Sequence, residues 1–207
     1  MIRQDRISKM LIILAVAIVI YLATFETTTV VMFPFFLLVG GVAMEVFLER
    51  GHKPEVVSFS EEKSSLSQVA FYTVLALFGI FLTGYAVNLV PSLKMLSLTG
   101  VNAMLYGVLM GIAEEQFFRG FITDWFLANM GNVWVALLAS AGVFTAYHFA
   151  RYGTSANALA YVFFGGLILS WTAWKSRRVS PSMLAHAGNN FISYINVTAK
   201  VVQKLWR

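Results

Sequence analysis

Apolar residues fill the chain in long runs, and polar residues gather in the short stretches between them. Several runs reach the length of about 20 residues that an α-helix needs to cross a bilayer. The pattern predicts an all-α fold, a polytopic membrane bundle of about seven helices. The predicted spans are approximately Met10–Phe25, Thr28–Leu48, Val69–Val90, Val101–Ala128, Val133–Phe149, Ala156–Trp174 and Met183–Val201.

The segments between the predicted spans indicate how the chain is oriented. The longest polar connection, Glu49–Gln68, is the one that the pattern predicts to be properly solvated. Lysine and arginine are more frequent in connections on the side of the N-terminus than in those on the other side. The positive-inside rule therefore predicts a cytoplasmic N-terminus.

Composition supports lipid as the surrounding medium. Of the 207 residues, 58% are hydrophobic and 12% are charged, whereas soluble domains contain about 25% charged residues. The net charge of +5 comes from short clusters between apolar runs, so we expect no nucleic-acid partner. The absence of cysteine excludes disulfides, thiolate catalysis and cysteine-ligated metals.

Three places within the predicted spans stand out for their ionisable and amide side chains, and an ionisable group costs a few kcal/mol to insert at mid-bilayer. Such residues are functional candidates by default. The fourth span carries "GIAEEQFFRGF", the fifth "FTAYHF" and the seventh "HAGNN". The candidates are Glu114, Glu115, Arg119, His148, His186 and Asn190.

Two adjacent glutamates on one helix point about 100° apart, so they face different neighbours. Glu115 and Arg119 are four residues apart in the order that favours an ion pair. Glu114 then has no partner on its own helix, and a desolvated carboxylate of that kind suits a general base. The alternative is a structural charge cluster, which explains Glu115 and Arg119 but not Glu114.

The two histidines within spans have both catalytic and structural interpretations. Phe144 precedes His148 by one turn and would support it, but a buried histidine can also be a satisfied core residue. His186 and Asn190 share a helix face, and both can donate hydrogen bonds to the oxygen of a tetrahedral intermediate. The alternative role for this pair is to join helices through hydrogen bonds.

Several catalytic classes are excluded by what the sequence lacks. It contains no GxSxG, and its two aspartates, Asp5 and Asp124, do not form a pair within two spans. Glutamate and histidine remain, as zinc ligands or as a metal-free site that activates water. The zinc motif HExxH is absent.

Three short segments together resemble a known family. "EEQFFRG", "FTAYH" and "HAGNN" are similar to the EExxxR, FxxxH and HxxxN motifs of the CPBP family, which includes type 2 CAAX prenyl endopeptidases and bacteriocin-processing or immunity membrane proteins. The resemblance covers about Val101 to Val197. It implies N-terminal helices and a loop over residues 1–100 and a catalytic core over residues 101–207, in one membrane domain.

The resemblance also implies a role for each motif residue. Water would be activated by Glu114 and His148, Arg119 would pair with Glu115, and His186 and Asn190 would stabilise the oxyanion. A metal-free mechanism is favoured, and the alternative is zinc bound by Glu114, His148 and His186. The implied substrate is a peptide or membrane protein, including one with a prenylated C-terminus. The implied location is the cell membrane, or the endoplasmic reticulum in a eukaryote.

Two other functions remain open at this stage. A member of the same fold can act without proteolysis, as a membrane scaffold or an immunity protein. A proton-coupled transporter also places Glu and His within spans, although the order of the three motifs and the lack of an inverted repeat disfavour it.

Straight helices would not bring all the candidates to one depth. At 1.5 Å per residue, His186 would lie about 15 Å from the level of Glu114 and His148. We therefore expect a bend, either a re-entrant segment at Ala150–Asn157 or a kink at Gly107 and Gly111. The GxxxG spacing of these glycines also allows close helix packing.

Overall fold

The computed structural model describes residues 33–49, 56, 65–87 and 98–205, which are helical apart from short connecting segments. The predicted all-α class is confirmed for this part of the chain, whereas the predicted first span lies outside it. The helices are α2 (Phe33–Glu49), α3 (Leu66–Ala86), α4 (Leu98–Glu115), the π-helix η2 (Gln116–Thr123), α5 (Asp124–Asn129), α6 (Val133–Tyr152), α7 (Ala156–Ser176) and α8 (Ser180–Leu205).

Two of these helices have the length and composition of membrane spans. They are α3 and α7, with 21 residues each, and the apolar stretch Val133–Phe149 of α6 is shorter. Along α3, Phe71, Phe78 and Phe81 are 62%, 58% and 69% exposed. A row of exposed aromatic side chains is suited to contact with lipid. The described residues therefore support a membrane bundle but do not establish the predicted number of seven spans.

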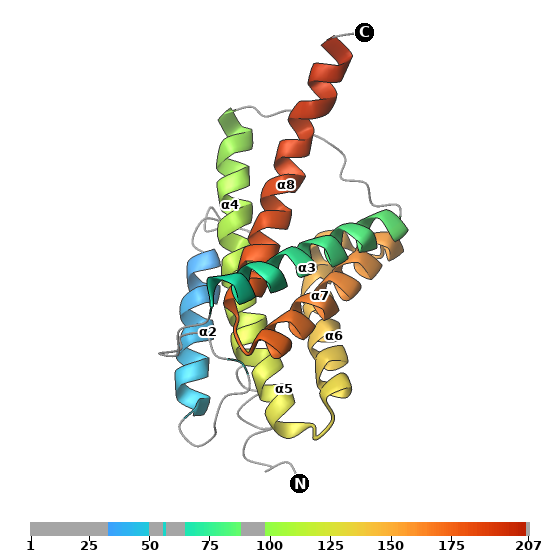
Figure 1. Ribbon diagram of the computed structural model, residues 1–207. Coiled ribbons are helices and arrows are strands. Elements are labelled where there is room, and N and C mark those ends of the chain that lie inside the picture. Colours follow the sequence, from blue (N-terminus) through green and yellow to red (C-terminus); the bar gives the residue numbers. More distant parts are fainter. Residues whose placement is uncertain (1–32, 50–55, 57–64, 88–97, 206–207) are drawn as a thin grey trace.

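The helices form two sets that cross each other (Figure 1). The helices α4 and α8 run side by side, and α3 and α7 lie together at an angle to them. In addition, α6 packs on α7, and α2 packs on η2. The three segments that carry the sequence motifs therefore meet where α4, α6 and α8 come together.

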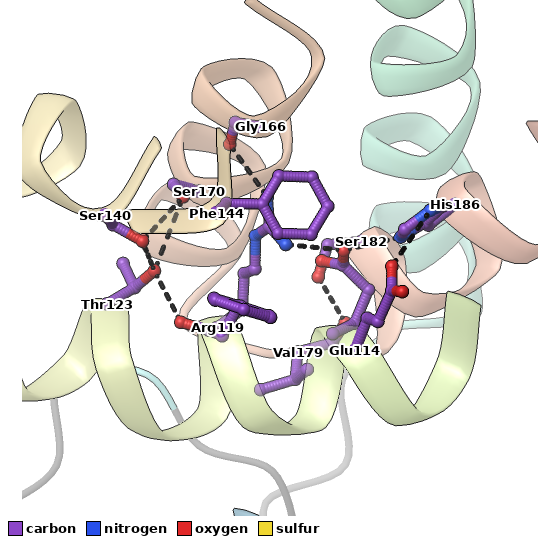
Figure 2. A network of polar contacts seen from close by, with 12 residues as sticks. Glu114, Arg119, Thr123, Ser140, Phe144, Gly166, Ser170, Val179, Ser182 and His186 are labelled. Atoms are coloured by element: carbon purple, nitrogen blue, oxygen red, sulfur yellow. Dashed lines mark hydrogen bonds and ion pairs between the residues drawn. The ribbon is translucent and has the colours of Figure 1, made fainter. Parts of the chain in front are cut away.

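The predicted fourth span is one continuous helical segment whose middle changes form. Between α4 and α5 it becomes the π-helix η2, and every residue of η2 is buried. The Thr123 hydroxyl donates to the Phe118 carbonyl at 2.9 Å. It also lies 2.6 Å from the Ser140 hydroxyl of α6 and 3.4 Å from the Ser170 hydroxyl of α7. This hydroxyl cluster, shown in Figure 2, joins η2 to both helices.

Short turns fix where α6 begins and ends. Gly131 has a φ of +65°, and the Asn132 side chain accepts from the amides of Trp134 and Val135 at the start of α6. Gly153, with a φ of +55°, ends the helix. The predicted re-entrant segment at 150–157 is wrong, because α6 continues to Tyr152 and α7 begins at Ala156.

The gap of about 15 Å that straight helices would leave between the levels of His186 and Glu114 is closed in the structure. The Nε2 atom of His186 lies 3.7 Å from Oε2 of Glu114. The helices are not parallel rods. In Figure 1, α7 runs obliquely, so α8 begins nearer the middle of the molecule than the turn between α5 and α6.

Gly111 marks the close approach of α4 and α8. The predicted kink is not seen, because α4 is a single helix from Leu98 to Glu115. A Cβ atom at Gly111 would lie 3.1 Å from the Ala187 nitrogen and 3.2 Å from its Cα atom. Gly111 therefore allows α4 and α8 to pack closely, as the GxxxG spacing also predicted, and does not bend the helix.

One residue of the predicted solvated loop is buried instead. Val56 is 0% exposed and packs in a cluster with Ala173 and Val179. Its amide donates to Oδ1 of Asp124 at 2.8 Å. This point of the connection is anchored beneath α5 and α7, so the expectation of a fully solvated loop is wrong at Val56.

Substitution of Gly111 tests the contact between α4 and α8. We expect Gly111→Ala to lower the melting temperature in detergent, since overpacking costs about 1–3 kcal/mol and the crowded atoms belong to the backbone. The matched control is Gly142→Ala, where an added Cβ atom meets nothing within 4 Å. At that position, the higher helix propensity of alanine should stabilise the folded state by about 0.5–1 kcal/mol. A melting temperature for Gly111→Ala that equals or exceeds that of Gly142→Ala would contradict the close contact.

Candidate active site

A fully buried arginine lies beneath the site. Arg119, from η2, is 0% exposed. Its Nη1 donates to Oε1 of Glu115 at 2.8 Å, so the predicted ion pair is present. Its Nη2 donates to the Gly166 carbonyl of α7 at 3.0 Å. Its Cζ atom lies 4.3 Å from the centre of the Phe144 ring, where a cation is attracted to the ring face.

A glycine on α7 makes room for this arrangement. A Cβ atom on Gly166 would lie 2.9 Å from Cδ1 of Phe144 and 3.5 Å from Nη2 of Arg119. The first distance is shorter than real Cβ contacts, so a side chain at residue 166 would displace the ring. The Phe144 ring therefore fits between the arginine and the histidines, and its centre lies 4.4 Å from that of His148.

Glu115 holds His186 as well as Arg119. Its Oε1 atom lies 2.8 Å from Nδ1 of His186, which comes from α8 (Figure 2). A carboxylate paired with a guanidinium can only accept, so Nδ1 of His186 carries a proton. The imidazole is thereby oriented with Nε2 toward Glu114, and Nε2 is a donor only when the ring is an imidazolium.

The orientation of His148 is fixed in a similar way. Its Nδ1 atom lies 2.9 Å from the Phe144 carbonyl, which accepts, so Nδ1 is the donor. In the neutral ring, Nε2 then presents a lone pair, and it lies 3.8 Å from Oε2 of Glu114. Tyr152 stacks on the outer face of the His148 ring, with centres 6.0 Å apart and planes within 8°.

The Glu114 carboxylate lies between the two histidines. Its Oε2 is 3.8 Å from Nε2 of His148 and 3.7 Å from Nε2 of His186. These distances exceed that of a direct hydrogen bond. The Tyr147 hydroxyl donates to the other oxygen, Oε1, at 3.4 Å. Only 5% of Glu114 is exposed.

A cavity of about 430 Å³ opens onto these groups. Its walls include Glu114, His148 and His186 and both asparagines of "HAGNN". Asn190 donates from Nδ2 to the Gly107 carbonyl at 2.8 Å, which leaves one N–H of its amide for other partners. The carbonyl oxygen of Asn189 accepts from the Tyr161 hydroxyl at 3.0 Å. The four predicted catalytic residues thus line one cavity.

The zinc alternative depends on the same side chains. One carboxylate and two imidazoles are suitable donors for zinc. Within the described part of the chain, no group of three or more His, Cys, Asp or Glu side chains is arranged to hold a metal ion. The choice between a metal-free and a zinc mechanism stays a prediction.

The sequence did not single out several residues that contact the site. Tyr147 and Tyr152 flank the His148 ring, and both lie on α6. The four-residue spacing of Tyr152 from His148 was a usable signal, because such residues share a helix face. Gly166 and the Tyr161–Asn189 bond depend on contacts between distant helices, and no local pattern indicates them.

Residues 96–192 match the family described as "Rce1-like: Type II CAAX prenyl endopeptidase Rce1-like". No curated protein and no solved structure is found to match. The matched segment contains the helices from α4 to α7, the first half of α8 and every side chain of the site above. Members of this family are membrane-embedded peptidases. Over residues 96–192, the chain is therefore similar to the Rce1-like family of type II CAAX prenyl endopeptidases.

Proposed function

We propose that this chain is an intramembrane endopeptidase in which Glu114 and His148 activate the water that hydrolyses a peptide bond. One observation carries the proposal: Glu114 Oε2 lies within 3.8 Å of two imidazole Nε2 atoms, inside a cavity formed by helices distant in sequence. A structural charge cluster accounts for Glu115 and Arg119 but gives Glu114 no role.

The proposed reaction begins with a water between Glu114 and His148. Both groups accept, so the water donates to each, and Glu114 takes one proton as the oxygen attacks the substrate carbonyl carbon. The new C–O bond converts the carbonyl to an oxyanion. When this intermediate collapses, the C–N bond breaks, and the proton held by Glu114 goes to the leaving amine.

His186 and Asn190 are placed to stabilise the oxyanion. As an imidazolium, His186 donates Nδ1–H to Glu115 and directs Nε2–H into the cavity. Oε1 of Glu115 lies 2.8 Å from Nδ1 of the ring, and Oε2 of Glu114 lies 3.7 Å from Nε2. Asn190 offers its second amide N–H. Donors fixed before reaction stabilise the charge that develops on the substrate oxygen.

We further propose a peptide or membrane-protein substrate, including a prenylated C-terminus, and a cell-membrane location with the N-terminus in the cytoplasm. The first assay compares wild-type protein and Glu114→Gln in detergent on prenylated and unprenylated peptides.

Glu114→Gln keeps the size of the side chain but removes the base, so we expect turnover to fall by about 10²-fold or more. The melting temperature should stay near that of the wild type. Cleavage is followed by mass spectrometry, with and without a chelator. Substantial turnover by Glu114→Gln would disprove its role, and loss of wild-type activity with chelator, restored by zinc, would favour a metalloprotease. A wild type that cleaves none of the peptides would favour a non-proteolytic function.

Arg119→Ala tests whether the buried ion pair of Glu115 and Arg119 stabilises the fold. It leaves Glu115 buried without its guanidinium partner, and breaking a buried pair costs about 3–5 kcal/mol. We expect a larger fall in melting temperature than for Glu114→Gln. The double variant Glu115→Gln, Arg119→Met removes both charges and should recover part of the stability. Equal melting temperatures for Arg119→Ala and Glu114→Gln would contradict this role of the pair.

Asn190→Ala tests the oxyanion site. Removal of one donor of this kind lowers kcat by about 10²–10³-fold, and we expect KM to change little. Asn189→Ala is the matched control, since its carbonyl oxygen is bonded to Tyr161. Equal losses of kcat for the two variants would contradict a specific role for Asn190 in stabilising the oxyanion.

A further inference from the structure

The helix α7, which is long and apolar enough to cross a membrane, ends in a positively charged turn. The segment Lys175–Arg178, "KSRR", holds three cations within four residues, and the sequence contains no aspartate or glutamate after Asp124. Lys175 and Arg177 are exposed, and Arg178 is half-buried. None of the three lines the cavity. Positive charge that the proposed reaction does not use is thus concentrated at one end of a candidate span.

The backbone of this turn holds Arg177 in a conformation that favours glycine. Its φ is +58°, and the other positive φ angles of the described residues belong to Gly131 and Gly153. Helices commonly end with glycine at this point, because a Cβ atom is crowded in the left-handed region. The chain therefore keeps a cation where glycine would fit the backbone better. A side chain retained at a strained position is a candidate for a functional role.

Hydrogen bonds and a buried neighbour fix the shape of the turn. The Arg178 amide donates to the Ala173 carbonyl at 3.1 Å, and the Ser176 hydroxyl donates to the Arg178 carbonyl at 3.0 Å. Val179, the next residue, is 0% exposed and packs with Val56 and Ala173. The cations therefore extend from an ordered backbone, which reduces the entropy that a ligand must overcome on binding.

Aromatic side chains surround the same end of α7. Trp171 and Trp174 lie in its last two turns, and the ring centre of Tyr72 of α3 lies 6.3 Å from that of Trp171. The Nζ atom of Lys175 lies 4.5 Å from the centre of the Trp174 ring. Tryptophan and tyrosine are enriched where a membrane protein passes through the lipid headgroups. The turn is therefore expected at headgroup level.

From these observations, we propose that the turn Lys175–Arg178 binds the phosphate group of an anionic phospholipid. A guanidinium donates paired hydrogen bonds to phosphate oxygens, and an ammonium adds a compact charge. Arg177 and Arg178 have other interactions as well, and the five N–H donors of a guanidinium allow it to hold a phosphate oxygen at the same time. With the N-terminus in the cytoplasm, as proposed above, the turn meets the leaflet that carries the anionic lipids. Lipid binding at this turn does not depend on peptidase activity.

The test measures lipid binding to the full-length protein in detergent by native mass spectrometry. Phosphatidylglycerol and phosphatidylcholine with the same acyl chains are added separately. We expect the wild type to bind phosphatidylglycerol more tightly, and each cation removed to weaken that preference about fivefold. Arg177→Gly removes a cation while it suits the backbone, so the melting temperature in phosphatidylcholine should not fall. Arg177→Lys should keep most of the preference, and the double variant Lys175→Gln, Arg177→Gly should lose most of it.

Arg151→Gln is the matched control. Arg151 is also an exposed cation in the last turn of a helix, 5.5 Å from the ring centre of Tyr152, but no other lysine or arginine is near it in sequence. It should leave the lipid preference unchanged. Equal binding of the two lipids by the wild type, a preference that survives in the double variant, or an equal loss in Arg151→Gln would overturn the assignment. Displacement of phosphatidylglycerol by an equal concentration of glycerol phosphate would overturn it too, because the ligand would then be a soluble anion.

Discussion

The burial of Arg119 is the constraint on which the rest of the site depends. A guanidinium removed from water is tolerated only when an anion and hydrogen-bond acceptors surround it. Here the Glu115 carboxylate, the Gly166 carbonyl and the face of Phe144 do so, from three different helical segments. Glu115 also bonds His186, the Phe144 carbonyl bonds His148, and Phe144 and Gly166 line the cavity, so the packing around the arginine sets the positions of both histidines.

The same constraint gives two adjacent glutamates different tasks. Glu115 is already bound, since one of its oxygens accepts hydrogen bonds from both Arg119 and His186. Glu114 points to another side of the helix and has only a long contact with the Tyr147 hydroxyl and two imidazoles beyond hydrogen-bond distance. A carboxylate in such surroundings is free to bind water and exchange a proton. The two glutamates differ because adjacent residues on a helix point in different directions. They differ also because only one carboxylate is needed to neutralise Arg119.

Much of the site could be predicted from sequence because its key spacings are local. The ion pair of Glu115 and Arg119 depends on four-residue spacing, and the motif order placed His148 and His186 with Glu114. The approach of α8 was not predictable, because it depends on the tilt of α7, which follows from packing between distant helices. Val56 was missed for a similar reason, since its burial depends on Asp124 and Val179, far along the chain. Local patterns thus identified the residues that line the cavity, whereas their geometry depends on tertiary contacts.

The π-helix lies between the candidate site and the packing beneath it. In an α-helix, residues four positions apart are rotated by about 40° around the axis. A π-turn closes a wider loop and turns less per residue, so it changes this angle between Arg119 and Thr123. In Figure 2, Arg119 and Thr123 project from the same side of η2, toward α6 and α7. Arg119 can then bond Gly166 while Thr123 reaches Ser140 and Ser170. One continuous helical segment thereby directs Arg119 and Thr123 toward α6 and α7, Glu115 toward His186 of α8, and Glu114 toward the cavity.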